Sequence, residues 1–134
     1  MALRYLLDAN VLSELARRPH GGVAGRVAEV GADAVCTSLV VAGELRFGAT
    51  QSGSDKLRAQ VEAILGAVEV LPLDPPVDQE YAAIRHALER SGQPIGPNDL
   101  WIAAHARSLD LTLVTANLAE FQRVPQLAVE SWLA

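Results

Sequence analysis

Three acidic residues stand where predicted strands and helices meet, and acidic side chains in such places can hold cations. Asp8 directly follows residues 4–7, a short apolar segment that predicts a strand. Asp99 opens one apolar helix, and Glu44 lies inside another, at residues 39–50. Carboxylate oxygens are the ligands that Mg²⁺ and Mn²⁺ prefer, and such ions serve phosphate chemistry. The three residues therefore indicate a site for a hard divalent cation.

Both aspartates also have a simpler interpretation as helix caps. An aspartate at the start of a helix can accept hydrogen bonds from free backbone amides. Asp8 and Asp99 each have an asparagine close by, Asn10 and Asn98, that could cap the helix instead and leave the carboxylate free. The sequence leaves both interpretations open for each aspartate.

Glu44 lies on the apolar side of its predicted helix. Its neighbours three and four positions away are Val40, Val41, Phe47 and Gly48, so its carboxylate extends along apolar surface. A charge buried there requires a partner, because burying an isolated charge costs several kcal/mol. That partner is either an arginine from elsewhere in the chain or a metal ion.

Short apolar strands alternate with helices along the chain, which predicts a parallel sheet covered on both faces. Two further polar residues, Thr115 and Asn117, end another strand, although Asn117 could simply cap the helix that follows. Function collects at the carboxyl ends of strands in such sheets. The predicted strands are residues 4–7, 34–37, 68–71, 111–115 and 129–131, and the predicted helices are 11–17, 23–30, 39–50, one capped by Ser54, 76–91, 97–109 and 118–121.

The chain has 134 residues, 50% of them hydrophobic, which predicts one domain spanning 1–134. A single cysteine, Cys36, excludes an internal disulfide framework, and no apolar run is long enough to span a membrane. We expect a protein of the reducing cytoplasm, with no membrane partner and no signal peptide. The net charge of −5 excludes bulk attraction of nucleic acid unless cations neutralise the carboxylates or arginines gather on one face.

Four segments in order resemble the PIN domain, and more narrowly the VapC toxins of type II toxin–antitoxin systems in their FitB-like branch. They are LLDANVLSEL at residues 6–15, TSLVVAGELRFGA at 37–49, IGPNDLWIAAHA at 95–106 and LTLVTANLAEFQRVPQL at 111–127. The resemblance implies a three-layer α/β/α sandwich with a central parallel sheet of about five strands. It also implies a Mg²⁺- or Mn²⁺-dependent endoribonuclease that a cognate VapB-like antitoxin holds inactive.

Position by position, the family's three core acidic ligands match Asp8, Glu44 and Asp99. Asn10 and Thr115 match polar residues that line the family's site. Asn117 stands where many PIN domains have a fourth acid, which implies that a second metal ion would be held weakly. Two other departures are Ala9, where a threonine is often found, and Trp101, where an aliphatic residue is common. The position of Ala9 is not a core ligand in the family, and Trp101 could affect packing or the shape of the substrate that fits.

The resemblance implies that a water molecule activated by the metal attacks phosphorus in line, leaving a 5′-phosphate and a 3′-hydroxyl. RNA or the antitoxin could contact Arg17, Arg18, Arg46 and Arg85, although solvated arginines and pairs within the chain are equally good interpretations. The apolar helices between residues 39 and 65 predict a groove for an antitoxin helix, or a homodimer interface. His105 and Cys36 are expected to be structural.

Two other functions compete with the nuclease. The neutral Asn117 could mark a weakened site, in a binding module that grips RNA or the antitoxin without cutting. A strand followed by Asp-x-Asn is also similar to the haloacid-dehalogenase phosphatases, whose first aspartate is a nucleophile. Those enzymes have a second acid where this chain has Asn10, and Lys56 is the only lysine available here. The phosphatase is therefore the weaker alternative.

Overall fold

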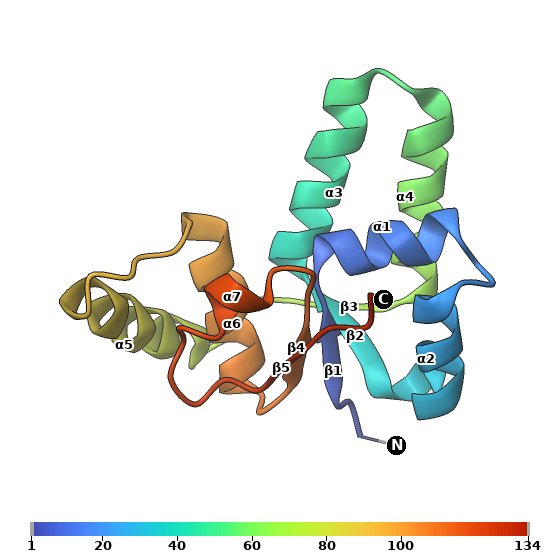
Figure 1. The fold of residues 1–134 in the computed structure, drawn as a ribbon. Coiled ribbons are helices and arrows are strands. Elements are labelled where there is room, and N and C mark those ends of the chain that lie inside the picture. The colour runs from blue at the N-terminus through green and yellow to red at the C-terminus, as the bar shows by residue number, and fades with distance from the viewer. Residues whose placement is uncertain (1, 134) are drawn as a thin grey trace.

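A five-stranded parallel sheet forms the centre of the molecule. The computed structural model describes residues 2–133. The sheet has the order β3-β2-β1-β4-β5, and every neighbouring pair of strands is parallel (Figure 1). This arrangement confirms the predicted α/β sandwich with about five strands. The strands are β1 (Tyr5–Leu7), β2 (Val35–Ser38), β3 (Glu69–Leu71), β4 (Thr112–Val114) and β5 (Val129–Glu130).

Seven α-helices cover the sheet on its two faces. Right-handed crossovers place α1–α4 on one face, because the chain steps from β1 to β2 to β3 in one direction. The chain then returns through β4 and β5, which places α5–α7 on the other face. The helices are α1 (Ala9–Arg17), α2 (Gly22–Val30), α3 (Leu39–Ser52), α4 (Asp55–Ala67), α5 (Val77–Arg90), α6 (Pro97–Ser108) and α7 (Leu118–Phe121), with a 3₁₀ turn at Ala32–Ala34.

The central strands are fully buried, which explains why they are short apolar runs without polar alternation. Leu6, Leu7, Leu113 and Val114 have no exposed surface, because helices cover both faces of the sheet. Cys36 is buried in β2, where burial is the main cause that raises the pKa of its thiol to about 12. A thiol with such a pKa is inert, which agrees with the expected structural role.

The helix ends follow the capping signals in the sequence, with small shifts. Ser54 caps α4 by accepting a hydrogen bond from the Leu57 amide at 3.1 Å. Gly92 ends α5 with a φ of 70°, a left-handed conformation that favours glycine. α1 begins two residues earlier than predicted, because Asp8 caps it. Between residues 2 and 133, no helix is long and apolar enough to cross a membrane.

Candidate active site

The carboxyl ends of β1 and β4 lie side by side at the centre of the sheet. Leu7 pairs with Val114, and the Asp8 amide donates a hydrogen bond of 2.9 Å to the Val114 carbonyl. After β1 the chain continues toward β2, whereas after β4 it continues toward β5 on the other side. Open parallel sheets form a crevice where the connections diverge in this way. The predicted polar residues thus end the two strands that border this crevice.

Asp8 is held rigidly at the end of β1. It is the N-cap of α1, and its Oδ1 accepts a hydrogen bond of 2.8 Å from the Ala9 amide. Its Oδ2 accepts one of 2.8 Å from the hydroxyl of Thr115, which is itself fully buried. The capping interpretation is therefore right, and the alternative cap, Asn10, is an exposed residue inside α1. Capping uses only one oxygen of Asp8, so it does not exclude a second role.

Glu44 projects from α3 toward the start of α6. It is half-buried, and its Oε2 accepts a hydrogen bond of 3.4 Å from the Asn98 side chain. Burial raises the pKa of Glu44, as does the charge of Asp8, while the Asn98 hydrogen bond opposes both. The predicted arginine partner is absent from the part of the chain that the structure describes.

Asp99 lies in the first turn of α6 but does not cap it. Gly96 is the N-cap and uses no side chain, so capping by Asp99 or Asn98 is a wrong interpretation. The pKa of Asp99 is raised to about 7, first by burial and then by the hydrogen bond that its protonated carboxyl donates to Glu120. The negative charges of Glu120, Asp8 and Glu44 raise it further. The other three acidic side chains thus all act on the pKa of Asp99.

Glu120 is the member of this group that the sequence did not reveal. It lies in α7, and its Oε2 accepts a hydrogen bond of 2.6 Å from the Asn117 side chain. Its Oε1 accepts one of 3.3 Å from the Gly96 amide, which joins α7 to the start of α6. Asn117 occupies the N-cap position of α7 without a side-chain cap bond, because its amide binds Glu120 instead. The spacing from Asn117 to Glu120 was the available signal, and it also suits an ordinary acid in a first helical turn.

The four carboxylates are suitable ligands for a hard divalent cation, although they are not yet arranged to surround one. Within residues 2–133, none of the four carboxylates has a Lys, Arg or His partner within 4.0 Å. Nor does any group of three acidic, His or Cys side chains there have the spacing to hold an ion as it stands. Oxygen ligands and uncompensated negative charge both favour Mg²⁺ or Mn²⁺. Binding would require Asp99 to release the proton that burial and the neighbouring carboxylates favour.

Without divalent ions, we expect the protein to be more stable at pH 5 than at pH 8. The carboxyl of Asp99 binds its proton more tightly in the folded state, so its contribution is fully present below about pH 4 and is lost as the pH rises through about 7. Solvent screening limits the difference to about 1–2 kcal/mol. Thermal unfolding in EDTA at both pH values measures it, and the Asp99→Asn variant should lack this component of the difference.

The four candidate contact arginines all have partners within the chain. Ion pairs join Arg17 and Arg18 to Glu14 at 3.3 and 3.4 Å, Arg46 to Glu62 at 2.8 Å and Arg85 to Glu89 at 2.9 Å. Each arginine is more than half exposed, and ion pairs in water contribute little to stability. RNA or antitoxin contact by these residues stays a prediction.

Comparison with known proteins places this arrangement in a family. Residues 5–127 match the PIN domain. Ribonuclease VapC2 of Haemophilus influenzae is 35% identical over 132 residues, covering 98% of this chain and 99% of the relative. The tRNA(fMet)-specific endonuclease VapC of Salmonella typhimurium is 34% identical over 131 residues, covering 97% and 98%. The chain therefore belongs to the PIN-domain family, within its VapC branch.

Solved structures agree with this assignment. The DNA-bound VapBC complex of Salmonella typhimurium contains a chain that superposes with a TM-score of 0.90 at 33% identity, covering 98% of this chain and 99% of that one. A FitAB complex bound to a DNA fragment matches with a TM-score of 0.82 at 29% identity, covering 97% and 96%. The expected likeness to both VapC and FitB is confirmed.

Proposed function

We propose that this chain is the toxin of a type II toxin–antitoxin pair and acts in the cytoplasm as an endoribonuclease dependent on Mg²⁺ or Mn²⁺. The observation that carries the proposal is the group of four acidic side chains where the connections after β1 and β4 diverge. Within residues 2–133, none of the four has a basic partner. The related chain named a tRNA(fMet)-specific endonuclease makes tRNA the first substrate to test.

Asp8, Glu44 and Asp99 would hold the metal ion, with Glu120 as a fourth candidate ligand. When bound, a divalent ion supplies positive charge opposite the phosphate. It also lowers the pKa of water, so that hydroxide is available near neutral pH to attack phosphorus. Asp8 is already fixed by Ala9 and Thr115, so its carboxylate needs little reorganisation. Asp99 must release its proton before it can act as a ligand, so we expect metal affinity to rise between pH 6 and 8.

Asn117 and Thr115 support the acidic side chains instead of replacing one of them. Thr115 Oγ1 accepts a hydrogen bond of 3.0 Å from the backbone amide of Asn117 while it donates to Asp8. The Asn117 side chain in turn orients Glu120. We infer that a neutral residue at position 117 does not by itself leave the site weak, because Glu120 brings a fourth carboxylate. This favours the nuclease over a binding module that does not cut.

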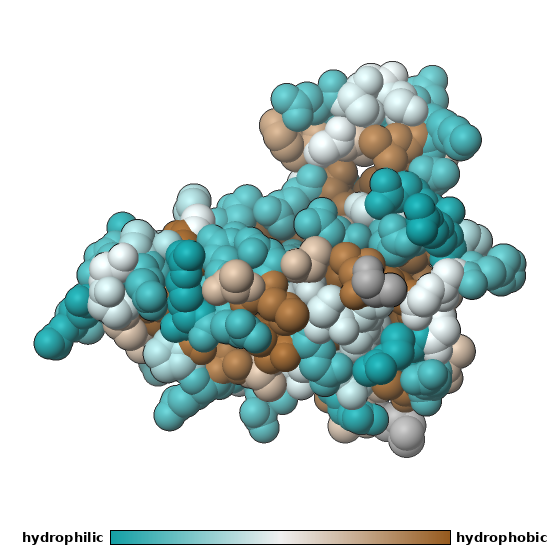
Figure 2. Space-filling model, viewed as in Figure 1, coloured by the Kyte–Doolittle hydropathy of each residue, from teal (hydrophilic) through white to brown (hydrophobic). Residues whose placement is uncertain are grey.

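We propose that the groove between α1, α3 and α4 binds a helix of the antitoxin. It encloses about 250 Å³, and Figure 2 shows hydrophobic surface in the gap between α3 and α4. The groove has apolar residues on one side and Arg17 and Asn10 on the other. This pattern suits an amphipathic helix with an acidic edge, because acidic side chains could contact Arg17 and Asn10. The groove is lined by Asn10, Ser13, Ala16, Arg17, Leu45, Leu57, Gln60, Val61 and Ile64.

The expected homodimer is also a proposal. Leu39 and Phe47 project from α3 with 50% and 66% of their surface exposed, which is unusual for large apolar side chains. The molar mass in solution, measured by light scattering, tests it. A clean monomer at high concentration would exclude the dimer and leave the nuclease proposal intact.

Expression of this chain in a bacterial host is expected to arrest growth. The arrest should disappear with Asp99→Asn, and co-expression of the cognate antitoxin should also relieve it. Plating efficiency after induction measures the effect, with immunoblots to confirm equal amounts of protein. Equal growth arrest by both chains would show that toxicity does not depend on this site and would contradict the proposal.

A further inference from the structure

A buried histidine joins α6 to the end of a strand in the sheet. His105 lies on the same helix as Asp99, and only 1% of its surface is exposed. Its Nδ1 is 2.8 Å from the hydroxyl oxygen of Ser38, the last residue of β2. Pro72, which directly follows β3, lines the same cavity as the ring. The ring therefore links α6 to the carboxyl end of β2.

The ring of His105 and the hydroxyl of Ser38 share a hydrogen bond in which either group can donate, depending on which ring nitrogen carries the hydrogen. Burial is the main cause that lowers the pKa of His105, while the backbone of Pro72 and the charge of Asp74 oppose it. The Ser38 oxygen also accepts a hydrogen bond of 3.1 Å from the backbone amide of Val40.

Ser38 is the N-cap of α3, the helix that carries Glu44. The contacts from His105 through Ser38 to Val40 thus set the position of α6 relative to the first turn of α3. That position matters at the site, because Glu44 on α3 and Asn98 on α6 meet at 3.4 Å. A shift of about 1 Å between these helices would separate Glu44 from Asp99, and such shifts reduce rates strongly in active sites.

We propose that His105 is a positioning residue, which holds α6 against α3 so that Asp99 and Glu44 can bind the same divalent ion. The inference rests on the proposed function, since it assigns these carboxylates to one metal site. It goes beyond the structural role expected of His105 from the sequence. A residue needed only for packing would affect stability without a specific effect on metal binding.

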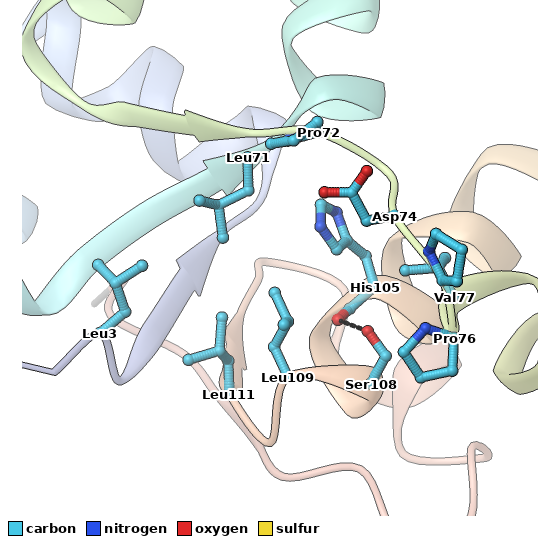
Figure 3. Close-up of a pocket in the computed structure, with 11 residues that line it drawn as sticks. Leu3, Leu71, Pro72, Asp74, Pro76, Val77, His105, Ser108, Leu109 and Leu111 are labelled. Carbon is cyan, nitrogen blue, oxygen red and sulfur yellow. Dashed lines mark hydrogen bonds between the residues drawn. The ribbon is translucent and has the colours of Figure 1, made fainter.

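A cavity beside the ring permits a test by chemical rescue. It encloses about 310 Å³, and Figure 3 shows His105 at its edge between Pro72 and Asp74, with Leu3, Leu109 and Leu111 across from it. In His105→Ala the space left by the ring would join this cavity. Added imidazole should then occupy the gap and restore the contact with Ser38.

The experiment measures Mn²⁺ affinity by calorimetry, kcat and KM with Mg²⁺, and Tm, with and without imidazole. The control, Val23→Ala, removes buried volume from α2, away from the site. We expect His105→Ala to lose about tenfold in metal affinity and in kcat with little change in KM, and imidazole to restore at least half of the loss. Val23→Ala should have a lower Tm than wild type. Its metal affinity and kcat should stay within twofold of wild type and should not respond to imidazole.

Wild-type metal affinity in a folded His105→Ala, or rescue of Tm by imidazole without rescue of affinity, would overturn the inference. If His105→Ala does not fold, His105→Leu replaces it, because leucine keeps much of the buried volume but has no atom that can hydrogen-bond with Ser38. In that variant, the same reductions in metal affinity and kcat would support the inference, and wild-type metal affinity would overturn it. Failure of the wild-type chain to bind any ion would instead overturn the proposed function, so the two failures are distinguishable.

Discussion

Asp99→Asn is expected to reduce RNA cleavage by about three orders of magnitude while raising the Tm of the metal-free protein. The change removes a proposed metal ligand, and it also removes a carboxyl whose pKa is raised to about 7 by burial and by the Glu120 contact. At pH 8 the folded wild-type protein must keep this carboxylate charged beside others, which is unfavourable. Relief of about 1 kcal/mol corresponds to a Tm higher by about 3–6 °C.

Asp110→Asn provides the matched control for this experiment. Asp110 follows α6 with a φ of 56°, a left-handed conformation that asparagine also adopts. The same chemical change there should leave cleavage and Tm unchanged. A Tm gain in Asp99→Asn with full activity would confirm the electrostatics but remove Asp99 from the site. Loss of activity together with a large drop in Tm would mean that the charge of Asp99 stabilises the fold, contrary to our account.

Two substitutions of Asp8 should separate its capping role from its role as a ligand. Asp8→Asn keeps one oxygen that can accept from the Ala9 amide but loses the second acceptor for the Thr115 hydroxyl, so we expect a smaller loss of stability than in Asp8→Ala. Asp8→Ala removes the cap and leaves the buried Thr115 hydroxyl without its acceptor, which costs about 1–2 kcal/mol. Both variants lose the charge, and both should lose cleavage by about three orders of magnitude.

Chemical denaturation and a tRNA cleavage assay measure these two effects on the same preparations. The decisive comparison is Asp8→Asn, because it changes charge with little change in structure. Cleavage at the wild-type rate in that variant would show that Asp8 is only a helix cap. Equal stability of Asp8→Ala and wild type would show that the hydrogen bonds to Ala9 and Thr115 contribute little.

The sequence predicted the elements and three of the four acidic residues, because these features depend on local patterns. Short apolar runs predicted all five strands, and Asp8 and Asp99 were found because they follow or open such elements. The carboxylate of Glu44 was recognised because a charge on an apolar helix side needs a partner. Each of these signals lies within a few residues of the side chain concerned.

Features that depend on how distant segments meet could not be predicted. Glu120 resembles an ordinary acid in a first helical turn, and only the packing of α7 against the start of α6 brings it to Asp99. The partner of Glu44 proved to be Asn98, which the sequence suggested only as a cap. His105 likewise joins segments far apart in the chain, so its hydrogen-bond partner Ser38 left no local pattern.

End-mapped cleavage of bacterial RNA by the purified chain tests the central claim most directly. Reactions with Mg²⁺, with Mn²⁺ and with EDTA would be run beside Asp99→Asn and Asp110→Asn prepared in the same way. We predict discrete cuts that require the metal ion and carry 5′-phosphates and 3′-hydroxyls, present with Asp110→Asn and absent with Asp99→Asn. Cuts that persist in EDTA, or products with 2′,3′-cyclic phosphates, would contradict attack by water at a carboxylate-bound metal.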